Sequence, residues 1–136
     1  MSTRSLNALQ MGQLGEHICA ISLLKQGISC QIVNLEKTDI IVTAPNKMIR
    51  VQVKSSHIRE ERHKTPAYVF QKVFGGKKQI LTLKECDILA FVALDIERVF
   101  FQHVNSAYYK ARFSTKKFMV EDVDRISWEE SIKEIK

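Results

Sequence analysis

The sequence predicts a single domain that mixes helices and strands, of α/β or α+β type. Its 136 residues are enough to bury one hydrophobic core and too few for two domains. The apolar share of 45% and the charged share of 26% are ordinary for a globular protein. Apolar residues recur at helical spacing near both ends of the chain, and segments with the residue pattern of β-strands lie between them. We therefore expect one domain covering residues 1–136.

The first element is predicted to be a helix over residues 8–26, ended by Gly27 at the usual C-terminal position. Its apolar residues form two faces, so we expect neighbours to cover the helix on two sides. Gly12 and Gly15 are poor helix formers, and we expect them to allow close approach of another backbone. Glu16 falls among apolar residues of one arc, where a carboxylate needs a partner.

Three strands are predicted to follow. Residues 29–35 alternate in polarity, residues 39–44 form a β-branched run, and residues 48–54 alternate strictly. In the last of these, Arg50 and Lys54 share a face because side chains in a strand alternate with a period of two. The turn that begins at Pro45 is short, so we expect the last two strands to pair as an antiparallel hairpin.

The rest of the chain predicts further strands and a closing helix. Residues 56–65 have no clear period and indicate an exposed loop or a short helix, and residues 68–74 indicate a strand or another aromatic-bearing segment. Residues 87–94 are apolar on both faces, as in a central strand, with residues 99–104 as the neighbour across a turn. Residues 128–136 predict a short helix with Ser127 as its cap.

The positive charge is concentrated in the centre of the chain. The formal net charge is +6, but residues 44–84 carry ten Lys or Arg against only Glu60 and Glu61, so this stretch has a charge of +8 and the remainder −2. A polyanion such as DNA or RNA is the natural partner of such a segment. The alternative is a solvated basic face without a ligand. A membrane surface is disfavoured because the stretch lacks an amphipathic helical period.

The cysteines and the hydropathy indicate a protein of the cytoplasm. Cys19, Cys30 and Cys86 are odd in number and far apart, which predicts free thiols packed as small hydrophobes, with neither a zinc site nor a disulfide. No apolar run approaches the roughly 20 residues that cross a bilayer. The N-terminal residues are polar and unlike a secretory signal. We expect no association with a membrane.

Asp39, Gln52 and Lys54 are the strongest candidates for a reactive site. If the hairpin pairs across a turn near residue 46, Asp39 lies opposite Gln52 to Lys54, and facing residues are about 5 Å apart. Carboxylate and amide oxygens can hold Mg²⁺, and a nearby Lys can orient or deprotonate an attacking water. This set suits hydrolysis of a phosphodiester. Glu16 adds a second carboxylate; the alternative is a salt bridge from Glu16 to Lys54 or Arg50 without catalysis.

Three segments together resemble a known family. GQLGEHICAISLLKQG, TDIIV and VQVKSS follow in the order of a helical Glu, a strand Asp and a (Glu/Gln)-X-Lys strand, which is similar to the PD-(D/E)XK nuclease superfamily. Within it, the chain most resembles archaeal Holliday-junction resolvases and the intron-encoded homing endonucleases of cyanobacteria, which also carry Gln. The match is good over residues 12–56 and loose over 68–104. It implies a restriction-endonuclease-like core, with a central mixed β-sheet flanked by helices.

The resemblance also implies a role for each site residue. Asp39 is expected to be the principal metal ligand, with Gln52 and the backbone carbonyl of Val53 completing the protein ligands. Lys54 is expected to be the catalytic lysine, and Glu16 the helical acid that binds metal directly or through water. Gln52 removes one negative charge from the site, which leaves open whether one or two ions bind. The implied cofactor is Mg²⁺, with Mn²⁺ as a substitute, and no organic cofactor is expected.

Contacts to DNA are expected from the third strand and from the basic segment after it. Ser55 and Ser56 either hydrogen-bond a phosphate or simply end the strand. Tyr68 and Phe70 suit either base stacking or packing in the core or at a subunit contact. The expected DNA-binding residues are Arg50, Ser55, Ser56, His57, Arg59, Arg62, Lys64, Lys72, Lys77 and Lys78.

These expectations combine into one function and one alternative. The function is that of a Mg²⁺-dependent DNA endonuclease, of homing-endonuclease or Holliday-junction-resolvase type. The alternative is a nuclease-fold module that binds DNA without cutting it, or that serves as an assembly partner. A chain of this size with a single site needs a homodimer or a larger homo-oligomer to address two strands.

Overall fold

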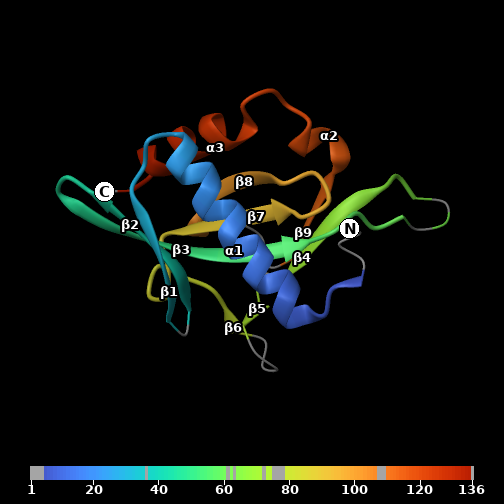
Figure 1. The fold of residues 1–136 in the computed structure, drawn as a ribbon, viewed down its shortest axis with the longest axis horizontal. Helices are drawn as coiled ribbons and strands as arrows, with labels where there is room; N and C mark the ends of the chain where they lie inside the picture. The colour runs from blue at the N-terminus through green and yellow to red at the C-terminus, as the bar shows by residue number, and fades with distance from the viewer. Residues whose placement is uncertain are drawn as a thin grey trace.

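The fold is built on a five-stranded sheet that helices flank (Figure 1). The computed structural model describes residues 5–35, 37–60, 62, 64–71, 73–74, 79–106 and 110–135. The elements in chain order are α1 (Ala8–Lys25), β1 (Cys30–Leu35), β2 (Thr38–Ala44), β3 (Lys47–Ser56), β4 (Ala67–Gln71), β5 (Val73–Phe74), β6 (Gln79–Ile80), β7 (Ile88–Ala93), β8 (Arg98–His103), η2 (Val104–Ser106), β9 (Lys110–Ser114), α2 (Thr115–Phe118) and α3 (Val123–Lys133).

The central sheet has the strand order β1-β2-β3-β7-β8. β2 and β3 pair antiparallel, with Ile40 opposite Val51, so the predicted hairpin is confirmed. β3 pairs with β7 in parallel, with Val51 beside Ile88, and β7 pairs with β8 antiparallel. Every residue of β7 is buried, as the apolar run predicted, because this strand lies inside the sheet between two others. The predicted mixed sheet flanked by helices is confirmed.

Two hydrophobic clusters cover opposite faces of the sheet. The first packs α1 and α3 on the sheet and includes Leu23 and Trp128; Figure 1 shows α1 running across the front of the strands. The second packs β4, β9 and α2 on β7. Here Phe70 meets Phe91 edge to face at 5.0 Å, and Tyr68 and Phe70 are only 1% and 2% exposed. Of the two alternatives for these aromatic side chains, the structure therefore shows core packing.

α1 begins with a capping box and ends at a glycine. Asn7 Oδ1 accepts the N–H of Gln10 at 2.8 Å, and Gln10 Oε1 accepts the N–H of Asn7 at 3.0 Å. Gly27 has φ +82°, which glycine adopts without strain. The prediction that neighbours cover the helix on two sides is wrong, since Leu9 and Ile21 are 72% and 51% exposed. Apolar residues occur all around this helix, so tertiary packing selects its buried side.

The last helix starts earlier than predicted. α3 begins at Val123, and Ser127 lies inside it instead of capping it. The Oγ of Ser127 accepts the N–H of Phe101 at 2.9 Å, which joins the helix to strand β8. Asp122, before the helix, has φ +56° and makes no capping hydrogen bond through its side chain. The N-terminus of α3 therefore lacks the side-chain cap by which a helix start is predicted from sequence.

The cysteines agree with the prediction. Cys19 and Cys86 are buried, Cys30 is partly buried, and all three are free thiols. Among the described residues, no helix combines the length and the apolar composition that crossing a membrane requires.

Candidate active site

The β2–β3 hairpin brings Asp39 level with Gln52. The register pairs Ile40 with Val51, so the preceding residue of β2 meets the following residue of β3. The N–H of Val53 donates to Asp39 Oδ2 at 2.8 Å. At the start of β2 a carboxylate oxygen thus accepts a backbone N–H of the neighbouring strand. This bond fixes the orientation of the Asp39 side chain.

Asp39 and Lys54 are both held in a low-dielectric environment. Burial raises the pKa of Asp39, and the N–H of Val53 and the charge of Lys54 partly offset this effect. Burial lowers the pKa of Lys54, while the charge of Asp39 acts in the opposite direction. Each group therefore lies within the electrostatic field of the other. The ion pairs formed by the described residues do not include one between them, so the two charges act across a gap.

Glu16 reaches the site from α1. Burial raises its pKa, the charge of Asp39 raises it further, and His17 lowers it. Two carboxylates whose charges interact in this way compete for ionisation unless a cation lies between them. The predicted alternative, a salt bridge from Glu16 to Lys54 or Arg50, is not among the ion pairs of the described residues.

The donor set fits a divalent cation. Gln52 is 7% exposed, and its Oε1 is buried without a hydrogen-bond partner. A buried acceptor left unpaired destabilises a protein by about 1–3 kcal/mol, and a bound cation would satisfy it. With the carboxylates of Asp39 and Glu16, this amide gives three oxygen donors from three elements, the ligands that Mg²⁺ or Mn²⁺ prefers. The described residues hold no group of three His, Cys, Asp or Glu suited to a metal, so Gln52 is required to complete the set.

A cleft of about 730 Å³ opens beside Lys54 at the end of β3. Its polar wall continues into the loop after β3 and includes Ser56, which donates its hydroxyl to the carbonyl of His57 at 3.0 Å. Its apolar wall is formed by Met11 of α1 and by β4. Four predicted DNA-binding residues line the cleft together with the predicted catalytic lysine: Ser55, Ser56, His57 and Arg59.

Asp95, which the sequence did not single out, holds this wall in place together with Tyr68. Asp95, in the turn after β7, accepts the N–H of Ile58 at 3.2 Å through Oδ1 and the hydroxyl of Tyr68 at 2.8 Å through Oδ2. Burial and then the bond to Asp95 raise the pKa of Tyr68, so the phenol stays a donor. Asp95 is 37 residues from Ile58, and no local pattern of the sequence announces such a contact.

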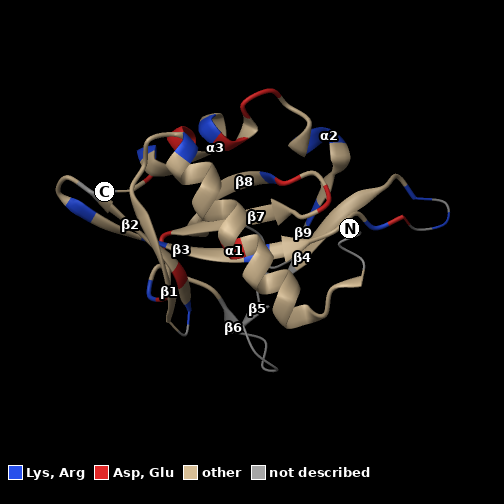
Figure 2. Cartoon of the chain, in the orientation of Figure 1, with Lys and Arg blue, Asp and Glu red and all other residues tan. Residues whose placement is uncertain are grey.

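The other predicted DNA contacts fall into three groups. Arg50 is tied to Asp87 by a 3.3 Å ion pair and donates to two backbone carbonyls of residues 83–84, so it braces the loop before β7. Arg62 and Lys64 are exposed in the connection between β3 and β4, where Figure 2 shows basic residues. Three of the predicted contacts lie outside the described residues: Lys72, Lys77 and Lys78.

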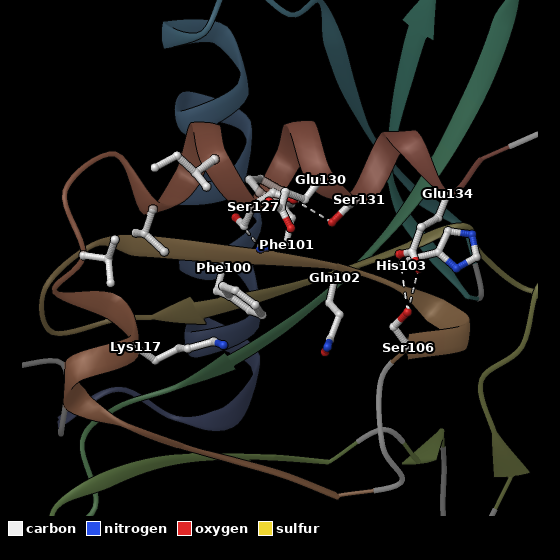
Figure 3. Close-up of a pocket in the computed structure, with 13 residues that line it drawn as sticks. Phe100, Phe101, Gln102, His103, Ser106, Lys117, Ser127, Glu130, Ser131 and Glu134 are labelled. Carbon is white, nitrogen blue, oxygen red and sulfur yellow. Dashed lines mark hydrogen bonds between the residues drawn. The ribbon is translucent and has the colours of Figure 1, made fainter.

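A second cavity, of about 550 Å³, lies between β8 and α3 (Figure 3). The ammonium group of Lys117 lies 4.5 Å from the centre of the Phe100 ring. The hydroxyl of Ser106 donates to Glu134 at 3.0 Å. Neither Asp39 nor any other predicted site residue lines this cavity.

Comparison with known proteins gives a likeness of fold. No protein-family model matches the chain, and no curated protein sequence matches it. Among solved structures, the chain is similar to a bacterial homing endonuclease, I-Ssp6803I, with a TM-score of 0.61 over 79% of this chain and 75% of the other. The sequences are 14% identical. The likeness supports the predicted nuclease-like fold, and at this identity it speaks for the fold alone.

Proposed function

We propose that this chain is a metal-dependent DNA endonuclease with an active site formed by Glu16, Asp39, Gln52 and Lys54. The observation that carries the proposal is the buried, unpaired Oε1 of Gln52, a residue that the strand register sets opposite the oriented Asp39. Most buried polar atoms are hydrogen-bonded, so this unpaired oxygen needs an explanation, and a bound cation would supply one. The similar fold of a protein described as a homing endonuclease supports the same class of chemistry.

Residues of three elements, α1, β2 and β3, would hold the metal. Asp39, Glu16 and Gln52 offer side-chain oxygens, and the carbonyl of Val53 is the expected backbone ligand. A bound Mg²⁺ would polarise a phosphoryl oxygen and stabilise the charge that develops on it. Asp39 enters this arrangement already oriented, because Val53 donates to it at 2.8 Å. Pre-orientation limits the reorganisation needed when substrate binds.

Lys54 acts on the attacking water or on the phosphate. It lines the cleft, and burial lowers its pKa. A lowered pKa brings the amine nearer to the range in which it accepts a proton from water. In its charged form, Lys54 instead neutralises the negative charge of the phosphorane-like transition state. Both roles need the same position beside Asp39.

DNA is proposed to follow the cleft away from Lys54. Ser56, His57 and Arg59 would contact the phosphates next to the scissile bond, and the exposed Arg62 and Lys64 would contact phosphates beyond them. One chain offers one such site, so cutting both strands requires a homodimer or a larger homo-oligomer.

Cleavage assays with matched variants test this function. Supercoiled plasmid, a four-way junction and nicked duplex are incubated with protein in Mg²⁺, in Mn²⁺ and in chelator. Asp39→Asn and Lys54→Met should each lower the cleavage rate by at least about 100-fold. Glu130→Gln and Lys117→Met make the same chemical changes at the cavity beside β8 and should leave the rate unchanged.

The outcomes separate the candidate functions. Preference for the junction indicates a resolvase, and cutting of defined duplex sites indicates a homing-type enzyme. Cleavage that persists in Asp39→Asn and Lys54→Met contradicts the site. Tight DNA binding without cleavage of any substrate, in either metal, favours the non-cleaving module instead.

A further inference from the structure

α1 approaches β3 most closely at a glycine. Gly15 is buried, and a Cβ added to it would lie 1.7 Å from the Oγ and 2.9 Å from the Cβ of Ser55. Rotation of the Ser55 side chain can move its Oγ, but the backbone of β3 fixes the position of its Cβ. Any side chain at position 15 therefore pushes the helix and the strand apart. The close approach predicted for Gly15 is confirmed, whereas that predicted for Gly12 is wrong, because no atom lies within 4 Å of the equivalent point.

This contact adjoins the proposed active site on both of its sides. Glu16 follows Gly15 on α1. On β3, the Cγ1 of Val53 lies 3.6 Å from the same point, and the N–H of Val53 orients Asp39. The contact at Gly15 therefore lies next to the residue that carries one carboxylate, Glu16, and next to the residue that orients the other.

The side chain of Ser55 is consistent with a packing contact on this face. Its Oγ is buried without a hydrogen-bond partner and faces Gly15. The hydroxyl is therefore turned toward the helix, although the residue also lines the cleft. Ser55 thus contributes close packing to this helix–strand contact and makes no hydrogen bond to the helix.

We propose that Gly15 is a positioning residue that sets the distance between the Glu16 and Asp39 carboxylates; this inference rests on the proposed function. Carbon atoms in contact stand about 3.5–4.0 Å apart, so an alanine at position 15 opens the contact with Ser55 by about 0.5–1 Å. Catalytic and metal-binding side chains must lie within about 0.5 Å of their best positions. A displacement of about 1 Å lowers reaction rates by about 100-fold. The wider spacing weakens metal binding because the two carboxylates no longer converge.

Four variants test the inference: Gly15→Ala, Gly12→Ala, Ser55→Gly, and Gly15→Ala combined with Ser55→Gly. Gly12→Ala is the matched control, because it makes the same change on the same helix where there is open space. The primary measurement is Mn²⁺ affinity of the DNA-free protein, by titration followed with electron paramagnetic resonance. Thermal unfolding in chelator reports the fold, and plasmid cleavage in Mg²⁺ reports activity.

Gly15→Ala should weaken Mn²⁺ binding by about 10-fold and slow cleavage by about 100-fold, while Gly12→Ala matches the wild type in both. Ser55→Gly removes both atoms that clash, so the double variant should return to within about threefold of Ser55→Gly alone. Wild-type Mn²⁺ affinity in folded Gly15→Ala, or a double variant as weak as Gly15→Ala, would overturn the inference. If the wild-type protein binds Mn²⁺ through Asp39 but cuts no DNA, the proposed function is wrong. The comparison of Mn²⁺ affinities among the variants then still decides the role of Gly15. Wild-type protein that binds no Mn²⁺ overturns both.

Discussion

At Asp39, a carboxylate is kept in surroundings that favour its neutral form. Burial raises its pKa from the ordinary value of 3.8. A group with a higher pKa in the folded than in the unfolded state binds its proton more tightly when folded. The ionised carboxylate therefore destabilises the fold above the raised pKa, and this destabilisation decreases as pH falls from the raised pKa to the unfolded value. Strain of this kind is typical of functional sites.

Asp39→Asn should therefore stabilise the metal-free protein at pH 7, by about 0.5–1 kcal/mol. The amide oxygen can still accept the N–H of Val53, but the desolvated charge is gone. The difference from the wild type should shrink as pH falls to 4. Urea unfolding in chelator at both pH values measures it. A variant less stable than the wild type at pH 7 would contradict this account of the burial of Asp39.

Two arginines of the basic segment should respond differently to removal. Arg50 is held by Asp87 and by two backbone carbonyls, so Arg50→Ala should lower the free energy of unfolding by about 1–3 kcal/mol. Arg62 is exposed in the loop after β3. Arg62→Ala should leave stability within about 0.5 kcal/mol and weaken DNA binding in low salt. Chemical unfolding and fluorescence anisotropy separate the two effects, and a stable Arg50→Ala protein with weakened DNA binding would reverse the assignment.

Local elements were predictable from the sequence, and long-range ones were not. The hairpin of β2 and β3 follows from a tight turn at Pro45 and alternation on both sides of it, and with the hairpin came the meeting of Asp39 and Gln52. The parallel pairing of Val51 with Ile88 joins segments that share no turn. The start of α3 was missed because Asp122 supplies no side-chain cap. Which face of α1 is buried depends on its neighbours, and so does the contact of Gly15 with Ser55.

The bond between α3 and the edge of the sheet makes a prediction for that helix. Ser127→Ala leaves the N–H of Phe101 buried without the acceptor it has at 2.9 Å, so the protein should lose about 1–3 kcal/mol of stability. Ser131 is also buried on α3, but its hydroxyl donates to the Ser127 carbonyl within the helix. Ser131→Ala is therefore the control and should lose less, about 0.5–1 kcal/mol. Thermal unfolding and amide exchange at Phe101 compare the two variants, and equal losses of stability would contradict the stabilising role of the bond between Phe101 and Ser127.

Charge is unevenly distributed over the molecule as a whole. The basic residues of the central segment extend from Lys54 along the connection between β3 and β4, whereas residues 121–135 carry six acidic and two basic side chains. Figure 2 shows this mixture of acidic and basic residues around α3. A molecule with this charge distribution binds a polyanion through its basic side and leaves the acidic side in solvent.

DNA binding by the whole protein should therefore depend strongly on salt. If the cleft and the loop after β3 neutralise about four to six phosphates, affinity should fall by about 100- to 1,000-fold between 50 and 200 mM salt. Fluorescence anisotropy with labelled duplex, in chelator to prevent cleavage, measures the slope. An affinity that does not change with salt would mean that the basic segment does not contact the phosphate backbone.

The parallel pairing of β3 with β7 has a consequence for how such a chain can diverge over generations. All proposed catalytic residues lie between residues 16 and 54, on α1 and on one hairpin whose register is set locally. Strand β7 enters beside β3 only after the chain has passed through residues 57–87. Insertions or exchanges in the exposed part of that connection would alter the surface proposed to contact DNA without moving Asp39 relative to Gln52. The proposed hydrolysis and the proposed choice of target could thus be inherited separately.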